Sequence, residues 1–456
     1  MKNILGIDLG TSSVKLLLRY GDGRVQKARE PYDERTPSGW LAALVRACTQ
    51  LDLSCVDAVG LSSQVGTYIV NEKMVLEWAS PVGLSELNEV KSLFSQQVFL
   101  REITMPHPDI ISYPIPRLLH ILRSEQNVKS ICMPKEIMVR FLTGCAVSDP
   151  YSWRGLANLE TGNYSHFFLD WLGISESVLP PLQRPDECAG RVTGEAARQT
   201  GLKEGTPVYT GCNDFFAGLA GTGIGRVGDL FDITGTSEHI GGIADSMLED
   251  APPVSGRYFE HFVRYGVTGS SGASMDYARK LYQGNVDADA CLTKKPPLFL
   301  PYLNGERCPV CDPDARGVFF GIGAGCTPEM MAYSVMEGIA FNLKQIVELL
   351  GIQGKRITVT GGAAQSDVLN QLKADVLGMQ VITLAEPEAS ALGAAMMAGV
   401  GCGLFASLEA AAAACVKQTG VFEPRVMNTY NARYEMYKQL YPALKDQFGN
   451  WKEIQP

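Results

Sequence analysis

The feature of this sequence that most restricts its fold is a short motif that occurs twice, almost half a chain apart. Asp8-Leu9-Gly10-Thr11-Ser12 is echoed by Asp232-Ile233-Thr234-Gly235-Thr236-Ser237 in a chain of 456 residues. A weak repeat at half the chain length indicates two related lobes that share an active cleft. We therefore expect a first domain at 1–225 and a second at 226–456.

Both copies of the motif lie beside segments with the composition of β-strands. Ile4-Leu5-Gly6-Ile7 precedes the first copy, and Leu230-Phe231-Asp232-Ile233 leads into the second. Each copy is therefore predicted to be a β-hairpin with a tight Gly-Thr-Ser turn. Small residues let backbone N–H groups approach an anion, and Lys15 adds a positive charge to the first copy. The pattern favours phosphate binding, and two ordinary hairpin turns remain the alternative.

A third glycine turn follows a predicted strand. Arg356-Ile357-Thr358-Val359-Thr360 leads into Gly361-Gly362-Ala363-Ala364, and apolar spacing predicts a helix over about 366–377. Strand, glycine turn and helix N-terminus form a common nucleotide-binding arrangement. The chain lacks the GxGxxG and GxxxxGK[ST] patterns at this place, which argues against a Rossmann dehydrogenase and a P-loop enzyme.

Asp214 is the candidate catalytic base. It follows the predicted strand Val208-Tyr209-Thr210 and stands where a helix rich in small residues begins. Asp is also a favoured N-cap residue, so the local pattern alone favours capping over catalysis.

Composition excludes several classes of protein. The formal net charge of −9 opposes binding to nucleic acid and to acidic membranes. No apolar run approaches the roughly 20 residues that span a bilayer, and no signal peptide is recognisable. The 12 cysteines are scattered, which is typical of a reduced, cytoplasmic protein, and the single Cys308-x-x-Cys311 pair lacks the second pair of a zinc site.

Over nearly its full length the chain resembles the FGGY carbohydrate kinases of the actin-like ATPase superfamily, and the xylulokinase-like branch in particular. The matching segments, in the order and spacing of the family, are GIDLGTSSVK (6–15), GLSSQ (60–64), YPIPRLLHIL (113–122), PKEIMVRFLTG (134–144), GCNDFFAG (211–218), DITGTS (232–237), PYLNGERCPVCDPDARGVFFG (301–321), VMEGIAF (335–341), GGAAQSDVLNQLKADVLG (361–378) and EASALGAAMMAG (388–399). The resemblance implies two ribonuclease-H-like, actin-type lobes, each with a mixed five-stranded sheet between helices, around a central cleft for ATP and sugar.

The resemblance also assigns roles by position. Asp214 takes the proton of the attacking hydroxyl, and Asp8 holds Mg²⁺ through water. The residues implied at the nucleotide are Gly10, Thr11, Ser12 and Lys15 at the first phosphate turn, Gly235 and Thr236 at the second, Gly361, Gly362 and Ala363 at the adenosine and α-phosphate, and Asn370 near the nucleoside.

The sugar-binding half departs from the family pattern. Gln64 is kept, but Gly66 stands where xylulokinases have a histidine, and Phe215 follows the base where relatives usually have Asn or Gln. Trp78 is kept, whereas the Asp and Arg that commonly follow it are replaced. A sugar hydroxyl that faces glycine and phenylalanine loses a hydrogen bond. Xylulose is therefore expected to be a poor substrate.

The sequence thus predicts an ATP-dependent kinase for a small sugar or polyol, with ATP and Mg²⁺ as cofactors, and favours a ketose of the xylulose or ribulose type. The sequence does not determine the oligomeric state, and a homodimer is one alternative. One alternative is a sugar-sensing pseudokinase that binds without turnover. Another is an actin-like activator of a radical or dehydratase enzyme, which the scattered cysteines do not suit.

Overall fold

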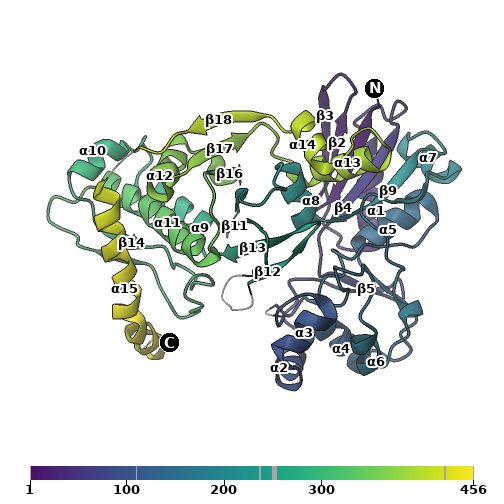
Figure 1. The fold of residues 1–456 in the computed structure, drawn as a ribbon, viewed down its shortest axis with the longest axis horizontal. Helices are drawn as coiled ribbons and strands as arrows, with labels where there is room; N and C mark the ends of the chain where they lie inside the picture. Colours follow the sequence, from purple (N-terminus) through teal and green to yellow (C-terminus); the bar gives the residue numbers. More distant parts are fainter. Residues whose placement is uncertain (1, 109, 236–237, 249–253, 426–427, 455–456) are drawn as a thin grey trace. The chain divides into compact units, whose positions relative to one another are not determined.

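The computed structural model describes residues 2–108, 110–235, 238–248, 254–425 and 428–454, which form two compact units (Figure 1). The first unit comprises Met1–Gly225 and Glu388–Val416, and the second comprises Arg226–Pro387 and Lys417–Pro456. The segment Glu388–Val416 does not follow the expected division, because its helix α13 (Ala389–Gly401) packs on the sheet of the first unit.

The first unit is built on a six-stranded mixed sheet. Its strand order is β3 (Val25–Pro31), β2 (Ser13–Arg19), β1 (Ile4–Leu9), β4 (Ala58–Ser63), β9 (Pro207–Asn213) and β8 (Cys188–Arg191). Strand β1 runs antiparallel to β2 and parallel to β4, and β4 runs parallel to β9. The predicted first hairpin is therefore β1–β2, with Asp8 opposite Lys15.

The second unit repeats this topology in a seven-stranded sheet. Its strand order is β12 (Val254–Tyr258), β13 (His261–Val267), β11 (Glu238–Ala244), β10 (Leu230–Thr234), β16 (Arg356–Gly361), β17 (Gln380–Leu384) and β18 (Gln418–Phe422). The five strands β13-β11-β10-β16-β17 have the same neighbours and directions as β3-β2-β1-β4-β9. The prediction of two related ribonuclease-H-like lobes is confirmed. Strands β8, β12 and β18 extend the expected five-stranded core.

Helices cover both faces of the first sheet. Strand residues alternate in direction, so Leu5 and Ile7 pack on the side of α1 (Pro37–Cys48) and α5 (Pro134–Thr143), and Ile4 packs with α13. Helix α13 approaches the sheet closely because the contact is made by glycines. A Cβ on Gly6 would stand 1.8 Å from the carbonyl oxygen of Ala391. Helix α8 (Asp214–Gly221) packs along α13, as Figure 1 also shows.

The first unit also contains a smaller region with a core of its own. Its elements are β5 (Tyr68–Val70), β6 (Met74–Leu76), α2 (Leu84–Leu93), α3 (Gln96–Ile103), α4 (Pro114–Ser124), β7 (Ile131–Cys132), α6 (His166–Leu172) and the single-turn helix Glu176–Val178. Aromatic side chains dominate this core, among them Tyr68, Phe99, Trp153 and Phe168. The remaining helix of the first sheet is α7 (Gly194–Thr200), and α14 (Leu408–Cys415) lies beside α13.

The helices of the second unit have clear start and stop signals, and α12 occupies the range predicted from the sequence. Helix α11 (Pro328–Leu350) has Thr327 as its N-cap and left-handed Gly351 at its end. Helix α12 (Asp367–Leu377) starts after the N-cap Ser366. The other elements are α9 (Ser271–Leu281), α10 (Ala288–Thr293), β14 (Leu298–Leu300), β15 (Val318–Phe320), the short helix Gly362–Gln365 and α15 (Asn428–Glu453). Across the described residues, no helix has the length and apolar character needed to cross a membrane.

Candidate active site

The carboxyl ends of three parallel strands bring the acidic candidates of the first unit to one edge of its sheet. Asp8 lies near the end of β1, Gln64 follows β4, and Asp214 follows β9. Open α/β sheets bind ligands at this edge. Residues more than 200 positions apart in the sequence therefore lie at the same edge because of the strand order within this one sheet.

Asp8 is almost completely buried and is oriented by the neighbouring strand. The Ser62 hydroxyl donates a hydrogen bond of 3.1 Å to Asp8 Oδ1. Burial raises the pKa of Asp8, and the charge of Lys15 opposes that rise. Lys15 itself forms an ion pair of 2.6 Å with Glu388, so part of its charge is already compensated. A single oriented carboxylate fits Mg²⁺, which usually takes one or two protein carboxylates, phosphate oxygens and several waters.

The first predicted phosphate turn presents two hydroxyl side chains to solvent, those of Thr11 and Ser12. Gly10 uses its own N–H within the turn, where it donates to the carbonyl of Ser13 at 3.1 Å. A Cβ on Gly10 would meet only ordinary contacts at 3.5 Å and beyond. The fold leaves room at Gly10, so any requirement for glycine there would come from a ligand.

Asp214 is not the N-cap of helix α8, although its position in the sequence favours capping. The cap is Asn213, whose side-chain oxygen accepts the N–H of Phe216 at 3.0 Å and whose amide donates to the Tyr151 carbonyl at 2.7 Å. Asp214 is the first residue of the helix and keeps partial solvent access. Burial of the carboxyl group and then the charge of Asp8 raise the pKa of Asp214 to about 7.

Two buried residues that were not singled out from the sequence support the strand before Asp214. Lys135 is fully buried, and its ammonium group lies 2.6 Å from Asp149. It also donates to the carbonyl of Thr210 at 3.0 Å. Lys135 lies in the segment PKEIMVRFLTG (134–144). A lysine on an otherwise apolar helix face could have indicated a buried charge at this position. Asp149 carries no comparable local pattern.

Gly66 has a left-handed backbone with φ of +82°. A Cβ there would come within 3.0 Å of the Ser112 side chain, so Ser112 occupies the space into which a larger residue would project. The Tyr68 hydroxyl donates to the Ser112 carbonyl at 3.0 Å and fixes this segment. Ser112 is a further residue that the sequence reasoning did not identify.

The other predicted sugar residues differ in accessibility. Gln64 is buried and donates its backbone N–H to Leu9 at 2.8 Å, whereas Trp78 is 45% exposed. Phe215 is half-buried, and its ring packs edge-on against Phe216. Arg117 lies fully buried beneath the segment that carries Trp78 and donates to the Trp78 carbonyl at 3.1 Å.

In the second unit the predicted nucleotide residues follow β10 and β16. Gly235 is exposed at the end of β10, and Thr236 lies outside the described residues. Gly361 has a φ of +89°, and a Cβ there would stand 2.0 Å from the carbonyl oxygen of Thr234, so the sheet itself requires this glycine. Gly362 has open space where a Cβ would project, and Ala363 follows it in the short helix Gly362–Gln365.

Asn370 is completely buried, which differs from the exposed position expected of a residue beside the nucleoside. Its amide group donates to the Ala364 carbonyl at 2.7 Å and so supports the glycine turn from below.

A cavity of about 970 Å³ adjoins this turn. Its size is near the upper end of the usual range for small-molecule sites. The lining residues come from the end of α9 and the loop after it, from α11, and from the start of α12: Met275, Arg279, Lys280, Tyr282, Gln283, Gly284, Asn285, Val286, Met336, Gln365, Ser366, Asp367 and Val368.

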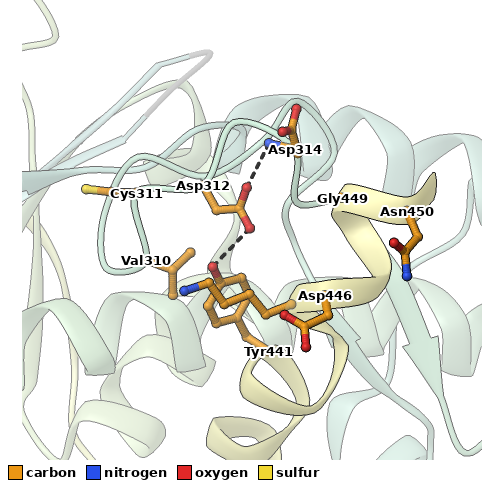
Figure 2. Close-up of a pocket in the computed structure, with 9 residues that line it drawn as sticks. Val310, Cys311, Asp312, Asp314, Tyr441, Asp446, Gly449 and Asn450 are labelled. Carbon is orange, nitrogen blue, oxygen red and sulfur yellow. Dashed lines mark hydrogen bonds between the residues drawn. The ribbon is translucent and has the colours of Figure 1, made fainter. Parts of the chain in front are cut away.

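A second pocket of the same unit, about 590 Å³, lies between α15 and the loop around Asp312 (Figure 2). Asp312 accepts the hydroxyl of Tyr441 at 2.9 Å and the N–H of Asp314 at 2.9 Å, as the dashed lines in Figure 2 mark. Its carboxylate therefore holds the loop to the helix. None of the residues predicted to bind ATP or sugar lines this pocket.

The two sheets share the ribonuclease-H-like strand order. The first has acidic residues at its carboxyl edge, and the second has a glycine turn beside a cavity. These features define a two-lobed protein of the actin-like class. The chain belongs to the FGGY family of carbohydrate kinases. The family's N-terminal domain matches residues 3–221 and its C-terminal domain matches residues 234–402.

Relatives of the chain extend over its full length. It is 28% identical to a xylulose kinase of Bacillus subtilis, with 98% of each chain covered. Solved structures with the same fold include a gluconate kinase of Lactobacillus acidophilus, at a TM-score of 0.87, 24% identity and 99% coverage of both chains. A ligand-bound xylulose kinase of the same organism has a TM-score of 0.85 and 24% identity, with 99% of this chain and 100% of that chain covered. The protein is an ATP-dependent sugar kinase, and the comparisons give no support to the pseudokinase alternative.

Proposed function

We propose that this kinase uses Asp214 as the general base that accepts the proton of the attacking sugar hydroxyl. The proposal rests on the different roles of two neighbouring residues. Asn213 caps helix α8, and this leaves the Asp214 carboxylate available at the edge of the sheet. A carboxyl group with a pKa of about 7 is a better base near neutral pH than an ordinary aspartate.

Mg²⁺ would be held by Asp8, with Ser62 fixing the orientation of the carboxylate. The metal supplies charge neutralisation to the phosphate oxygens when it is bound. The residues of the chain do the rest: Thr11 and Ser12 offer hydroxyl donors to phosphate, and Asp214 withdraws the sugar proton. The removal of water from such a site favours transfer to the sugar over hydrolysis.

The nucleoside of ATP would occupy the cavity beside α12, and its phosphates would extend along the turn at Gly361, Gly362 and Ala363. Gly235 and Thr236 are proposed to contact phosphate at the neighbouring turn. The support is that Gly362 leaves open space, while Gly361 is fixed by the sheet. The nearby Arg279 and Lys280 line the cavity and provide positive charge.

The substrate would be a small ketose that contacts Gln64 and Trp78, and the xylulose kinase relatives support a five-carbon ketose. Gly66 stands where the family has histidine, and Ser112 fills the space into which a side chain at position 66 would project. The site should therefore read the neighbouring sugar hydroxyl differently from a xylulokinase, which favours the ribulose type over xylulose.

The deciding experiment is the Asp214→Asn variant. Loss of a general base lowers kcat by about 10²–10⁴-fold, whereas ATP binding measured by calorimetry should be unchanged. Asp170→Asn, at an exposed position of α6, is the matched control and should keep full activity. Near-normal sugar-dependent ADP formation by Asp214→Asn would remove this residue from the mechanism.

A further inference from the structure

Helix α12 carries two completely buried polar side chains on one stripe, Asn370 and Lys373. Asn370 holds the glycine turn through the carbonyl of Ala364, at 2.7 Å. The ammonium group of Lys373 lies 2.5 Å from Asp232 on β10 and 2.5 Å from Glu238 on β11. One helix is thus tied to both turns that we propose bind the phosphates of ATP.

The three charged residues meet at the base of the second hairpin. Strand β10 ends at Thr234, directly opposite Glu238, where β11 begins. Asp232 and Glu238 therefore lie on the two paired strands at whose end Gly235 stands. An ammonium group that contacts both carboxylates fixes the separation of the strands at that point.

The cluster formed by Asp232, Glu238 and Lys373 contains two carboxyl groups and one ammonium group, all shielded from solvent. The other carboxylate oxygen of Asp232, Oδ1, is also buried and makes no hydrogen bond. Burial and then the charge of Glu238 raise the pKa of Asp232 well above its usual range. The pKa of Glu238 lies below its usual value because the charge of Lys373 and the hydrogen bonds from Asp232, Lys373 and Ser271 outweigh the effect of burial.

A second ion pair on α12 provides a comparison. Asp375 binds Arg425 at 2.6 Å, and this arginine also binds Asp289 at 2.9 Å. These contacts fasten the helix to other parts of the unit and touch neither proposed nucleotide turn. A purely structural ion pair on the same helix is therefore available as a reference.

We propose that Lys373 is a positioning residue for ATP, which sets the position of Gly235 at the end of β10 by holding Asp232 and Glu238 together. Asn370 holds the glycine turn that starts at Gly361 through the carbonyl of Ala364, so that α12 aligns this turn with Gly235. This inference rests on the proposed nucleotide site.

The test compares Lys373→Met with Asp375→Asn. Lys373→Met should raise KM for ATP about tenfold and should change kcat and KM for the sugar by less than about twofold, since it removes ground-state binding of one substrate. Asp375→Asn should lower the melting temperature without changing KM for ATP.

The double variant Lys373→Met/Glu238→Gln separates positioning from stability. Removal of the orphaned carboxylate should restore most of the melting temperature, because an unpaired buried charge is destabilising. KM for ATP should remain high, because no ammonium group holds strands β10 and β11 together in this variant. If the single variant does not fold, the double variant carries the test by the same measurement.

A normal KM for ATP in either Lys373 variant overturns the inference, as does a KM that follows the melting temperature. Gly362→Val distinguishes this failure from failure of the proposed nucleotide site. If Gly362→Val weakens ATP binding and the Lys373 variants do not, only the positioning role is lost. If all of them bind ATP normally, the nucleotide site itself is wrong.

Discussion

The two hairpins of this kinase occupy equivalent places in their sheets, yet their aspartates have different surroundings. Asp8 on β1 accepts a bond from Ser62 and faces Lys15, which reaches outward to the half-buried Glu388. Asp232 on β10 is sealed beneath α12 and contacts Lys373. The first arrangement leaves polar groups at the sheet edge, and the second encloses them.

The difference shows how one topology can serve two purposes. In the first unit the lysine stands on the neighbouring strand, at the position where it pairs across the hairpin. In the second unit it comes from the covering helix, so the charges compensate one another inside the fold. Asp8 lies one residue before the last paired position of its hairpin and Asp232 lies two residues before it. Because strand side chains alternate in direction, the two aspartates face opposite sides of their sheets and meet different partners.

The largest expected effect comes from exchanging the hairpin aspartates Asp8 and Asp232 for asparagine. Asp8→Asn should lower kcat by about 10²–10⁴-fold, because phosphoryl transfer depends on charge stabilisation at the metal and phosphates. Asp232→Asn should change kcat by less than about threefold, because Asp232 is buried beneath α12 against Lys373 and not at the open edge of the sheet. Steady-state kinetics with ATP and sugar check both variants. Equal losses in the two variants would show that the hairpins have the same role.

A smaller effect should separate the adjacent glycines of the third turn. Gly361→Ala places a Cβ 2.0 Å from the Thr234 carbonyl in a left-handed backbone, so it should lower the melting temperature markedly. Gly362→Val meets open space and should fold normally, but it should weaken ATP binding about tenfold by filling the space above the turn. Thermal melts and calorimetry distinguish the two outcomes. Unchanged affinity in Gly362→Val would place the nucleotide elsewhere.

Substrate choice is the next test, and it concerns the first unit alone. With Ser112 packed against Gly66, ribulose should exceed xylulose in kcat/KM by about tenfold, a difference of one hydrogen bond. A panel of xylulose, ribulose, a tetritol, a deoxyketose and a hexonate gives the measurement. A highest value for xylulose, at the level of a dedicated kinase, would contradict the inference from Gly66 and Phe215. Gly66→His should fail to restore xylulose activity, because φ of +82° and the Ser112 contact exclude the larger residue.

The smallest effect is on stability and depends on pH. The folded-state pKa of Asp214 is about 7, above its unfolded value, so the folded protein binds this proton more tightly. The buried carboxylate is therefore destabilising above pH 7, and that cost disappears as the pH falls below the unfolded pKa of about 3.9. Asp214→Asn should melt a few degrees higher than the wild type at pH 8 and equally at the acidic limit. A lower melting temperature at pH 8 would contradict this account of the site.

The sequence by itself determined the features that depend on local pattern. The half-length repeat established two related lobes, strand and turn composition located both hairpins, and apolar spacing gave the limits of α12. The ordered motifs were sufficient for the family, because each motif combines residue type with spacing along one chain.

Only the tertiary structure decided which of several adjacent residues caps a helix, is buried or forms an ion pair. Asn213 rather than Asp214 caps α8, since its amide also reaches Tyr151 across the unit. Asn370 faces inward, and Lys373 meets two strands that lie more than 100 residues earlier in the chain. Helix α13 joins the first sheet because glycines of the strands, Gly6 and Gly60, allow close contact with the helix backbone. Such outcomes depend on the distance between groups far apart in sequence, and residue spacing along the chain does not encode that distance.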